Sequence, residues 1–297
     1  MAVDYSEVLD FLEKLNKSEI VIQILIIIFA ILGNTMVLVA TWRERSLHEP
    51  NKYFVACLAV ADLLVGMIFA PLRLYQLVNI ENGGTTSIYF CRFYFWIDNF
   101  LQTASIYILT FISFDRYLKI SKPLQYKSRM TTSTLLKIIF IIWLITATVA
   151  TLAMFPYADS PSIYAGAQCI FMNRIFHTIG AVSAFFLPTT IMLVMYTLIF
   201  LVVHKRQKML RNGALGETSN NPNQRSALLR NLKVIRMLLV VVGVFIVCWG
   251  PFFVWLMIFY YQKKETFWLS LTYCYEHSCN NMVYFAMVLW QLVTILP

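Results

Sequence analysis

Seven apolar runs alternate with short polar segments along the chain. They cover roughly residues 20–42, 52–77, 88–113, 134–155, 175–203, 234–261 and 267–290. A helix needs about 20 apolar residues to cross the hydrocarbon core of a bilayer, and a helix satisfies its backbone hydrogen bonds internally there. The pattern therefore predicts an all-α membrane protein, a bundle of seven transmembrane helices.

The basic residues predict how this bundle is oriented. Most of the 24 Lys and Arg residues follow the first, third and fifth runs. Because Lys and Arg are retained on the cytoplasmic side, we expect the N-terminus outside and the C-terminus inside. The net charge of +9 then reflects topology and a cytoplasmic face suited to acidic lipid or protein, and it gives no reason to expect nucleic acid.

The low content of charged residues supports a membrane protein, and the polar segments divide the chain into three parts. Charged residues make up only 13% of the 297 residues, about half the fraction of a soluble domain. We expect an extracellular N-terminus at 1–19, a membrane domain at 20–290 with its third inner loop at about 204–230, and a short or truncated cytoplasmic end at 291–297. Asn16 begins the sequon Asn16-Lys17-Ser18 and is a candidate glycosylation site.

Two of the six cysteines lie on the predicted outer side. Cys91 precedes the core of the third run, and Cys169 lies in the loop before the fifth. Disulfides persist on the oxidising side of the membrane, so we predict a Cys91–Cys169 bond. Closing so long a loop is worth roughly 4 kcal/mol in the chain-entropy account.

Three acidic residues interrupt the apolar runs: Asp62, Asp98 and Glu276. Each costs at least about 2.5 to 3.5 kcal/mol at the bilayer centre, so each is a candidate functional group. The alternative is a structural pair between helices. Asp98 and Arg116 are five helical turns apart, which places them on one face about 27 Å from each other.

Aromatic residues surround Asp98 in the sequence. Tyr94, Phe95, Trp96 and Phe100 would supply rings beside the carboxylate, which suits a cation. In the sixth run, Trp249 lies next to Pro251, with Phe245 one turn before it and Phe252 and Phe253 after it. Core packing alone also explains such a stripe. Pro71, Pro188 and Pro251 predict kinks in the second, fifth and sixth runs.

One motif in each run carries a family resemblance. The motifs are Gly33-Asn34, LAVADLL around Asp62, Cys91 with Asp115-Arg116-Tyr117, Trp143, FFLP with Pro188 and then Tyr196, CWGPFF, and NNMVY from Asn280 to Tyr284, together with Cys169. From about Ile20 to Tyr284 the chain resembles the rhodopsin-like (class A) G-protein-coupled receptors. The resemblance implies a plasma-membrane receptor that signals to a heterotrimeric G protein and is not an enzyme.

Within that family the chain resembles biogenic amine receptors of muscarinic, histamine and trace-amine type. Asp98 occupies the position whose aspartate binds the ligand's ammonium group there. The resemblance implies a small-molecule amine as ligand, and a binding site formed by Asp98, Tyr94, Asn99, Gln102, Trp249, Phe252, Phe253, Tyr273 and Arg73. Gly180, Ala181 and Ala184 stand where catecholamine receptors carry hydroxyls, so catechols are disfavoured.

The resemblance assigns two further groups of residues. Asp62, Ser105, Asn34 and Asn280 match the family's site for a sodium ion, an allosteric modulator; no other cofactor is implied. Activation and G-protein coupling would use Asp115, Arg116, Tyr117, Pro123, Leu124, Tyr196, Phe245, Pro251 and Tyr284.

Some features leave alternatives open. Arg73 could point into the ligand cavity and bind a carboxylate, or it could pair with Asp98 or an outer carbonyl. If Arg73 binds a carboxylate, the ligand would be a zwitterion or a peptide. If Arg73 pairs with Asp98, the ligand would be a peptide or a lipid. Asn280-Asn281 replaces the family's usual Asn-Pro, which also allows a signalling-impaired relative.

Other classes fit the sequence less well. An opsin needs a lysine in the seventh run, and residues 267–290 contain none. A transporter could use the buried acids, but the odd number of runs and the lack of repeats argue against it.

Overall fold

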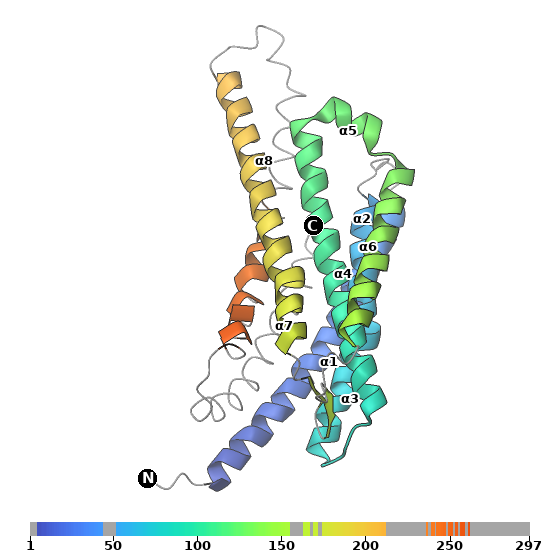
Figure 1. Ribbon diagram of the computed structural model, residues 1–297, viewed down its shortest axis with the longest axis vertical. Helices are drawn as coiled ribbons and strands as arrows, with labels where there is room; N and C mark the ends of the chain where they lie inside the picture. Colours follow the sequence, from blue (N-terminus) through green and yellow to red (C-terminus); the bar gives the residue numbers. More distant parts are fainter. Residues whose placement is uncertain are drawn as a thin grey trace.

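The computed structural model describes residues 5–43, 52–154, 163–166, 169–171 and 174–211, together with parts of 236–261. These residues form long helices that lie side by side along the longest axis of the molecule (Figure 1). The predicted seventh run lies outside the described residues, as does most of the third inner loop.

The helices fall where the apolar runs predict them. The first, third and fourth runs form α1 (Tyr5–Arg43), α4 (Ile88–Ser121) and α6 (Thr132–Ala153), with the short α5 (Pro123–Arg129) between the last two. Helix α1 begins well before residue 20, so most of the polar N-terminal segment is helical too. The described residues of the sixth run are helical between Val242 and Ile258.

The second and fifth runs each fold as one helix with a π-helical turn inside it. The second comprises α2 (Lys52–Leu64), η1 (Val65–Phe69) and α3 (Ala70–Glu81). The fifth comprises α7 (Arg174–Gly180), η2 (Ala181–Phe186) and α8 (Leu187–Arg211). Within the described residues, four helices are long and apolar enough to cross a membrane: Lys17–Arg43, Lys52–Asn79, Thr132–Leu152 and His177–Lys205.

The π-helical turns lie just before two of the prolines. Segment η1 ends two residues before Pro71, and η2 ends two residues before Pro188. In η1 the Ala70 N–H donates to the Val65 carbonyl, one residue further back than in an α-helix. Proline lacks an N–H and its ring clashes with the preceding turn. One wider turn accommodates the ring of Pro71 or Pro188 without ending the helix.

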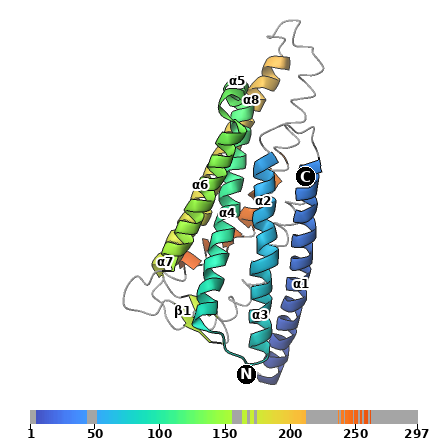
Figure 2. The same ribbon diagram turned by 90° about the vertical axis from the view of Figure 1, so that its right-hand side faces the viewer.

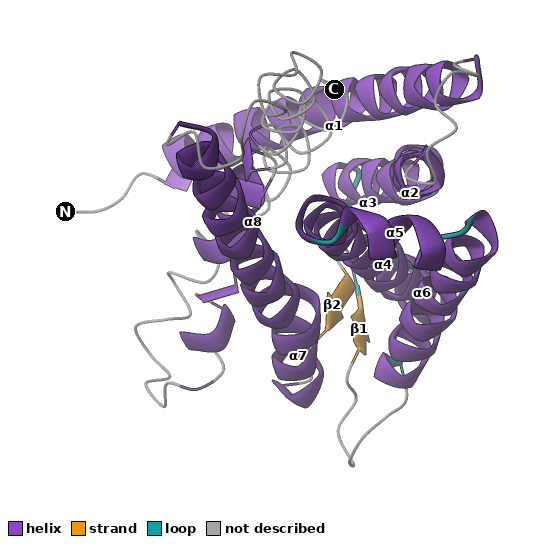
Figure 3. Ribbon diagram, turned by 90° about the horizontal axis from the view of Figure 1, so that it is seen from above, coloured by secondary structure: helices purple, strands orange, loops and turns teal. Residues whose placement is uncertain are grey.

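The described helices agree with the all-α prediction, and one short hairpin in the loop between α6 and α7 adds to them. Strands β1 (Ile163–Ala165) and β2 (Cys169–Phe171) pair antiparallel, with Tyr164 opposite Ile170. Seen from the end that carries α5, this hairpin lies between α7 and α4 (Figure 3). Strands of three residues are too short for a period-two pattern to reveal, and contacts with α4 support them here.

Helix α4 lies at the centre of the described bundle. It packs against α2, α6 and α8, and Figure 2 shows it between α6 and α2. Leu101, Ile108 and Ile112 of α4 are buried at helical spacing and join Met192 and Ile199 of α8 in one apolar core. Because α4 is central, its different faces contact different neighbouring helices.

Segment η1 approaches α1 closely at Gly66. A Cβ atom at this position would lie 2.7 Å from the Cβ of Ala30, well inside the contact distance of about 3.5 Å between carbon atoms. Ala30 is fully buried. Small residues on both helices therefore permit this approach, as is common between membrane helices.

Gly66→Ala should lower the melting temperature of the detergent-solubilised protein. The added methyl group overpacks the α1–η1 contact, at a cost of about 1–3 kcal/mol. The double variant Gly66→Ala/Ala30→Gly should recover most of the loss, because it removes the facing methyl group. Gly180→Ala is the control, since a Cβ there meets nothing within 4 Å. Equal melting temperatures for the two single variants would contradict the close approach.

Candidate ligand-binding and signalling site

A disulfide ties the hairpin to the start of α4. Cys91 and Cys169 are bonded, with their Cα atoms 5.4 Å apart, which confirms the predicted pair. Thr86 holds the same corner: its N–H and its hydroxyl both donate to the Gly166 carbonyl at 2.8 Å. The hairpin is therefore anchored at two adjacent points beside the end of α4.

Asp98 lies two turns further along α4 and is partly buried. Its Oδ1 accepts a hydrogen bond from Nε2 of Gln102, one turn away. No described cation forms an ion pair with it. Asn99 donates to the Phe95 carbonyl of its own helix and so is not directed at the carboxylate. Among the described residues, the hydrogen-bond partner of Asp98 is thus a neutral group.

The rings near Asp98 do not all surround it, which corrects one expectation. Trp96 stacks on Phe100 with ring centroids 5.1 Å apart, and Phe100 contacts Trp143 of α6. Trp96 also donates to the Thr151 hydroxyl of α6 at 3.1 Å. These rings point to α6 because they lie about 160–200° around the helix from Asp98, two residues to either side of it.

Tyr94 packs the other way, toward η1. Its ring centroid lies 5.3 Å from that of Phe69, and only 7% of the residue is exposed. It therefore forms part of the wall between α4 and the second helix.

Arg73 is engaged by a different acid from the one expected. Its Nη2 donates to Oε1 of Glu19 on α1 at 3.2 Å, and its Nη1 donates to Oε1 of Gln76 at 3.3 Å. Its ion pair among the described residues is with Glu19. The alternative in which Arg73 pairs with Asp98 is corrected, because Glu19 reaches the guanidinium from the facing helix.

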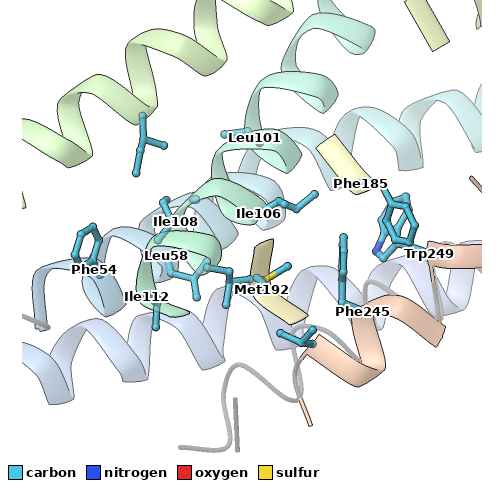
Figure 4. Packing of buried hydrophobic residues seen from close by; sticks show 14 of the residues in the cluster. Phe54, Leu58, Leu101, Ile106, Ile108, Ile112, Phe185, Met192, Phe245 and Trp249 are labelled. Carbon is cyan, nitrogen blue, oxygen red and sulfur yellow. The ribbon is translucent and has the colours of Figure 1, made fainter. Parts of the chain in front are cut away.

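An aromatic cluster joins the fifth and sixth helices. The Phe185 ring of η2 lies 5.4 Å from Phe245 and 4.7 Å from Phe253, and Trp249 stacks on Phe253 at 5.9 Å. Figure 4 shows Phe185 beside Trp249 and Phe245. Pro251, also in the sixth helix, follows Trp249 by two residues. The predicted aromatic stripe is thus an interhelical contact next to the proline.

Asp62 lies deeper in the bundle, where it is 3% exposed. The Ser105 hydroxyl of α4 donates to its Oδ1 at 3.0 Å. Its Oδ2 is buried and has no hydrogen-bond partner among the described residues. Asn34, by contrast, donates to the Ala30 carbonyl of α1 and does not bond to Asp62.

The far end of α4 carries the other group of predicted residues. Asp115 is buried and accepts a hydrogen bond from the Tyr126 hydroxyl of α5 at 2.9 Å. The Tyr196 hydroxyl of α8 lies 3.0 Å from the Ser113 hydroxyl of α4. Tyr117 packs against the same core. This arrangement connects α4, α5 and α8 at one end of the bundle.

Helix α5 presents an apolar side chain beyond this network. Pro123 is its first residue, and Leu124 is 86% exposed. An exposed leucine at the tip of the bundle is available to a partner.

Several predicted site residues are not described by the structure. Phe252, Tyr273, Glu276, Asn280 and Tyr284 lie outside the described residues, and nothing is described of the Asn16 side chain.

Comparison with known proteins identifies the class to which the chain belongs. Residues 33–290 match the family model described as 7 transmembrane receptor (rhodopsin family). The match covers most of the chain, so the chain belongs to the rhodopsin-like family of seven-transmembrane receptors. It is accordingly a multi-pass plasma-membrane receptor and not an enzyme.

The relatives agree with the resemblance to amine receptors. Trace amine-associated receptor 1 of Homo sapiens is 28% identical over 246 residues, covering 78% of this chain and 71% of the relative. Octopamine receptor beta-2R of Chilo suppressalis is 30% identical over 287 residues, covering 88% and 69%. 5-hydroxytryptamine receptor 2C of Canis lupus familiaris is 30% identical over 270 residues, covering 78% and 59%.

Sequence reasoning missed Glu19, Gln23 and Thr86. Glu19 and Gln23 are both 2% exposed, and Gln23 donates to the Ala70 carbonyl at 3.2 Å. Their spacing of four residues at the start of an apolar run is a signal for one polar helix face. Nothing local to Thr86 indicates its role, because Gly166 is 80 residues away.

Thr86→Val should destabilise the anchored hairpin. The substitution keeps the shape but removes the hydroxyl that donates to Gly166, a loss of about 1 kcal/mol. Thermal unfolding should show a lower melting temperature than wild type, whereas Thr86→Ser should retain it. Thr148→Val is the matched control, because the exposed Thr148 hydroxyl donates only to Leu144 within its own helix. An equal decrease in melting temperature for Thr148→Val would contradict a specific role for the Thr86–Gly166 hydrogen bond.

Proposed function

We propose that the receptor binds a small cationic amine through Asp98 and transmits its binding to a heterotrimeric G protein at the opposite end of α4. The observation that carries the proposal is a partly buried carboxylate on the central helix whose described hydrogen-bond partner, Gln102, is neutral. The matched relatives, named as trace amine, octopamine and 5-hydroxytryptamine receptors, support the same ligand chemistry.

Charge explains the preference for an amine. An ammonium group would replace the water around Asp98 with a charge-assisted hydrogen bond, which is stronger than one between neutral groups. Truncating one partner of such a buried pair costs about 2–5 kcal/mol. The anchored hairpin at the start of α4 would limit the access of water to this pair.

The fifth helix argues against catechol ligands. The Ser183 hydroxyl donates to the Ile179 carbonyl of its own helix at 2.7 Å, so the backbone already uses it. The neighbouring Gly180, Ala181 and Ala184 offer no hydroxyl. We therefore propose an amine whose remaining part is apolar or aromatic. The engagement of Arg73 by Glu19 weighs against the zwitterionic alternative.

Activation would link the aromatic cluster to the far end of α4. An agonist that contacts Asp98 and Trp249 would favour a different packing of Phe245 against Phe185. Pro251 supplies a weak point in the sixth helix, and rearrangement of Arg116 and Tyr196 would open a cavity for the G protein. The agonist drives this change only as far as it binds the open state more tightly than the closed one.

The proposed orientation places the hairpin outside the cell and α5 inside. It rests on the excess of Lys and Arg between the helices. Exposed Leu124 of α5 would then face the G protein.

Asp98→Asn should abolish most amine binding while the protein still folds. Asparagine keeps the volume and the bond with Gln102 but removes the charge, so affinity should fall by at least about 30-fold. Competition binding and G-protein activation with 2-phenylethylamine, tyramine, octopamine and 5-hydroxytryptamine provide the measurement. Asp98→Glu, which retains the charge, should lose less. If Asp98→Asn binds every amine as wild type does, the amine proposal is wrong.

We also propose that Asp62 forms a site for a sodium ion that favours the inactive state. Its unpartnered Oδ2 and the adjacent Ser105 oxygen fit the preference of a hard cation for oxygen ligands. A bound ion would supply the positive charge that Asp62 lacks among the described residues. Asn34 would need to turn away from Ala30 to contribute.

Replacing KCl by NaCl at constant ionic strength should lower agonist affinity of the wild type. Sodium should shift the receptor toward the inactive state, because it would bind that state more tightly than the active one. Asp62→Asn should make the affinity independent of the salt used. Agonist affinities that differ between the two salts as much in Asp62→Asn as in wild type would rule out Asp62 as the sodium ligand.

A further inference from the structure

A groove of about 730 Å³ lies between the second helix and the start of α4. One wall is a single face of η1 and α3, whose residues recur at spacings of three and four. These residues are Met67, Ile68, Pro71, Leu72 and Tyr75. Phe90 of α4 and the preceding segment Thr85–Ser87 complete the lining. The volume is within the range of about 300–1,000 Å³ that is usual for small-molecule sites.

The groove faces away from the bundle. Met67 and Tyr75 are 56% and 54% exposed, although both lie in the span Lys52–Asn79, which is long and apolar enough to cross a membrane. Phe69 and Leu77 follow them by two residues, which is about 200° around the helix, and both are buried. The buried face of the helix is thus directed to the bundle, and the groove is open to lipid.

Aromatic rings separate the groove from the interior. The Phe90 ring lies 5.2 Å from that of Tyr75 and stacks on Tyr94 at 6.3 Å. Tyr94 in turn contacts Phe69 at 5.3 Å, and these two residues are only 7% and 4% exposed. No lining residue of the groove belongs to the proposed amine site. The groove is therefore a different site.

The lining has hydroxyl groups at one end and no charge. None of its nine residues is acidic or basic. The segment Thr85–Ser87 follows the end of the span at Asn79, where the interface with water begins. Thr86 already donates to Gly166. Thr85 is exposed, and the Ser87 oxygen accepts from the Phe90 N–H, so the Ser87 hydroxyl hydrogen can still be donated.

This distribution favours a neutral, mostly apolar lipid with a single hydroxyl group. The charges of a phospholipid head group would find no counter-ion in the lining. A flexible acyl chain would fit the apolar wall, but it loses more conformational entropy on binding than a rigid ligand does. A sterol has a rigid, flat ring system that can pack on the rings of Pro71, Tyr75 and Phe90, and its one hydroxyl lies at the end that reaches the interface.

We propose that the groove is a binding site for a membrane sterol, with the sterol rings against Tyr75 and Phe90 and the sterol hydroxyl at Thr85. The proposal does not depend on the amine function, because the two sites share no residue.

Photo-crosslinking in nanodiscs tests the site. The receptor is reconstituted in phosphatidylcholine with a photoreactive diazirine analogue of cholesterol, and labelled peptides are identified by mass spectrometry. Labelling should concentrate on residues 67–75 and 85–90 and be suppressed by excess cholesterol. Cholestane, which lacks the hydroxyl, should compete about fivefold less well. Labelling spread evenly over the lipid-facing helices overturns the proposal, as does equal competition by dioleoylglycerol, a neutral lipid with one hydroxyl and flexible chains.

Two substitutions test the lining. Met67→Trp should reduce labelling about tenfold or more, because the indole would occupy part of the groove. Met36→Trp is the matched control and should leave labelling unchanged, because Met36 is 66% exposed on α1 and is not part of the lining.

Thr85→Val should reduce labelling about fivefold, whereas Thr85→Ser should retain it. This pair leaves the packed wall intact, so it decides the question even if Met67→Trp does not fold. Wild-type labelling in either Met67→Trp or Thr85→Val overturns the proposal.

Excess 2-phenylethylamine distinguishes this site from the amine site. It should leave labelling of the groove unchanged, and loss of the label at saturating amine would overturn a separate sterol site. Amine binding by Asp98→Asn remains the test of the amine function, so either proposal can fail while the other holds.

Discussion

A carboxylate enclosed by apolar helices loses its hydration and is stable only with a hydrogen-bond or ionic partner. The polar interior of this receptor is organised by the partners that its buried carboxylates have. Glu19 is paired with a cation from the facing helix. Asp62 and Asp98 instead accept hydrogen bonds from the neutral groups of Ser105 and Gln102. Acids with neutral partners keep an attraction for cations from outside the chain. The difference between one internal ion pair and two acids with neutral partners is the basis on which we propose that Asp62 and Asp98 bind cations.

Helix α4 carries or contacts each of the polar groups of the proposed sites. It starts at the disulfide with Cys91, carries Asp98 two turns later, supplies Ser105 to Asp62, and ends near Asp115, which bonds to α5. Since the helix packs against α2, α6 and α8, the proposed signal from Asp98 would pass through dense packing rather than through a flexible linker. The aromatic contact of Phe185 with the sixth helix provides a second connection beside it.

Much of the fold and part of the site could be predicted from sequence because the signals are local. An apolar run must be helical in a bilayer, and five turns between Asp98 and Arg116 place both on one face. The Cys91–Cys169 bond followed from which cysteines lie on the oxidising side. By contrast, Trp96 and Phe100 stand close to Asp98 in sequence yet pack on α6. Adjacent positions on a helix point in different directions, so nearness in sequence is a poor guide to contact.

The sequence by itself determined the membrane spans, the disulfide, the likeness to amine receptors and the acidic residue at the centre of the proposed site, because each depends on residue type and spacing along the chain. Only the tertiary structure decided which acid Arg73 pairs with, that Thr86 anchors Gly166, and that a π-helical turn accommodates Pro71. Arg73 is paired with Glu19, which lies 54 residues away in the sequence. Partners on different helices meet only through packing, which no local pattern records.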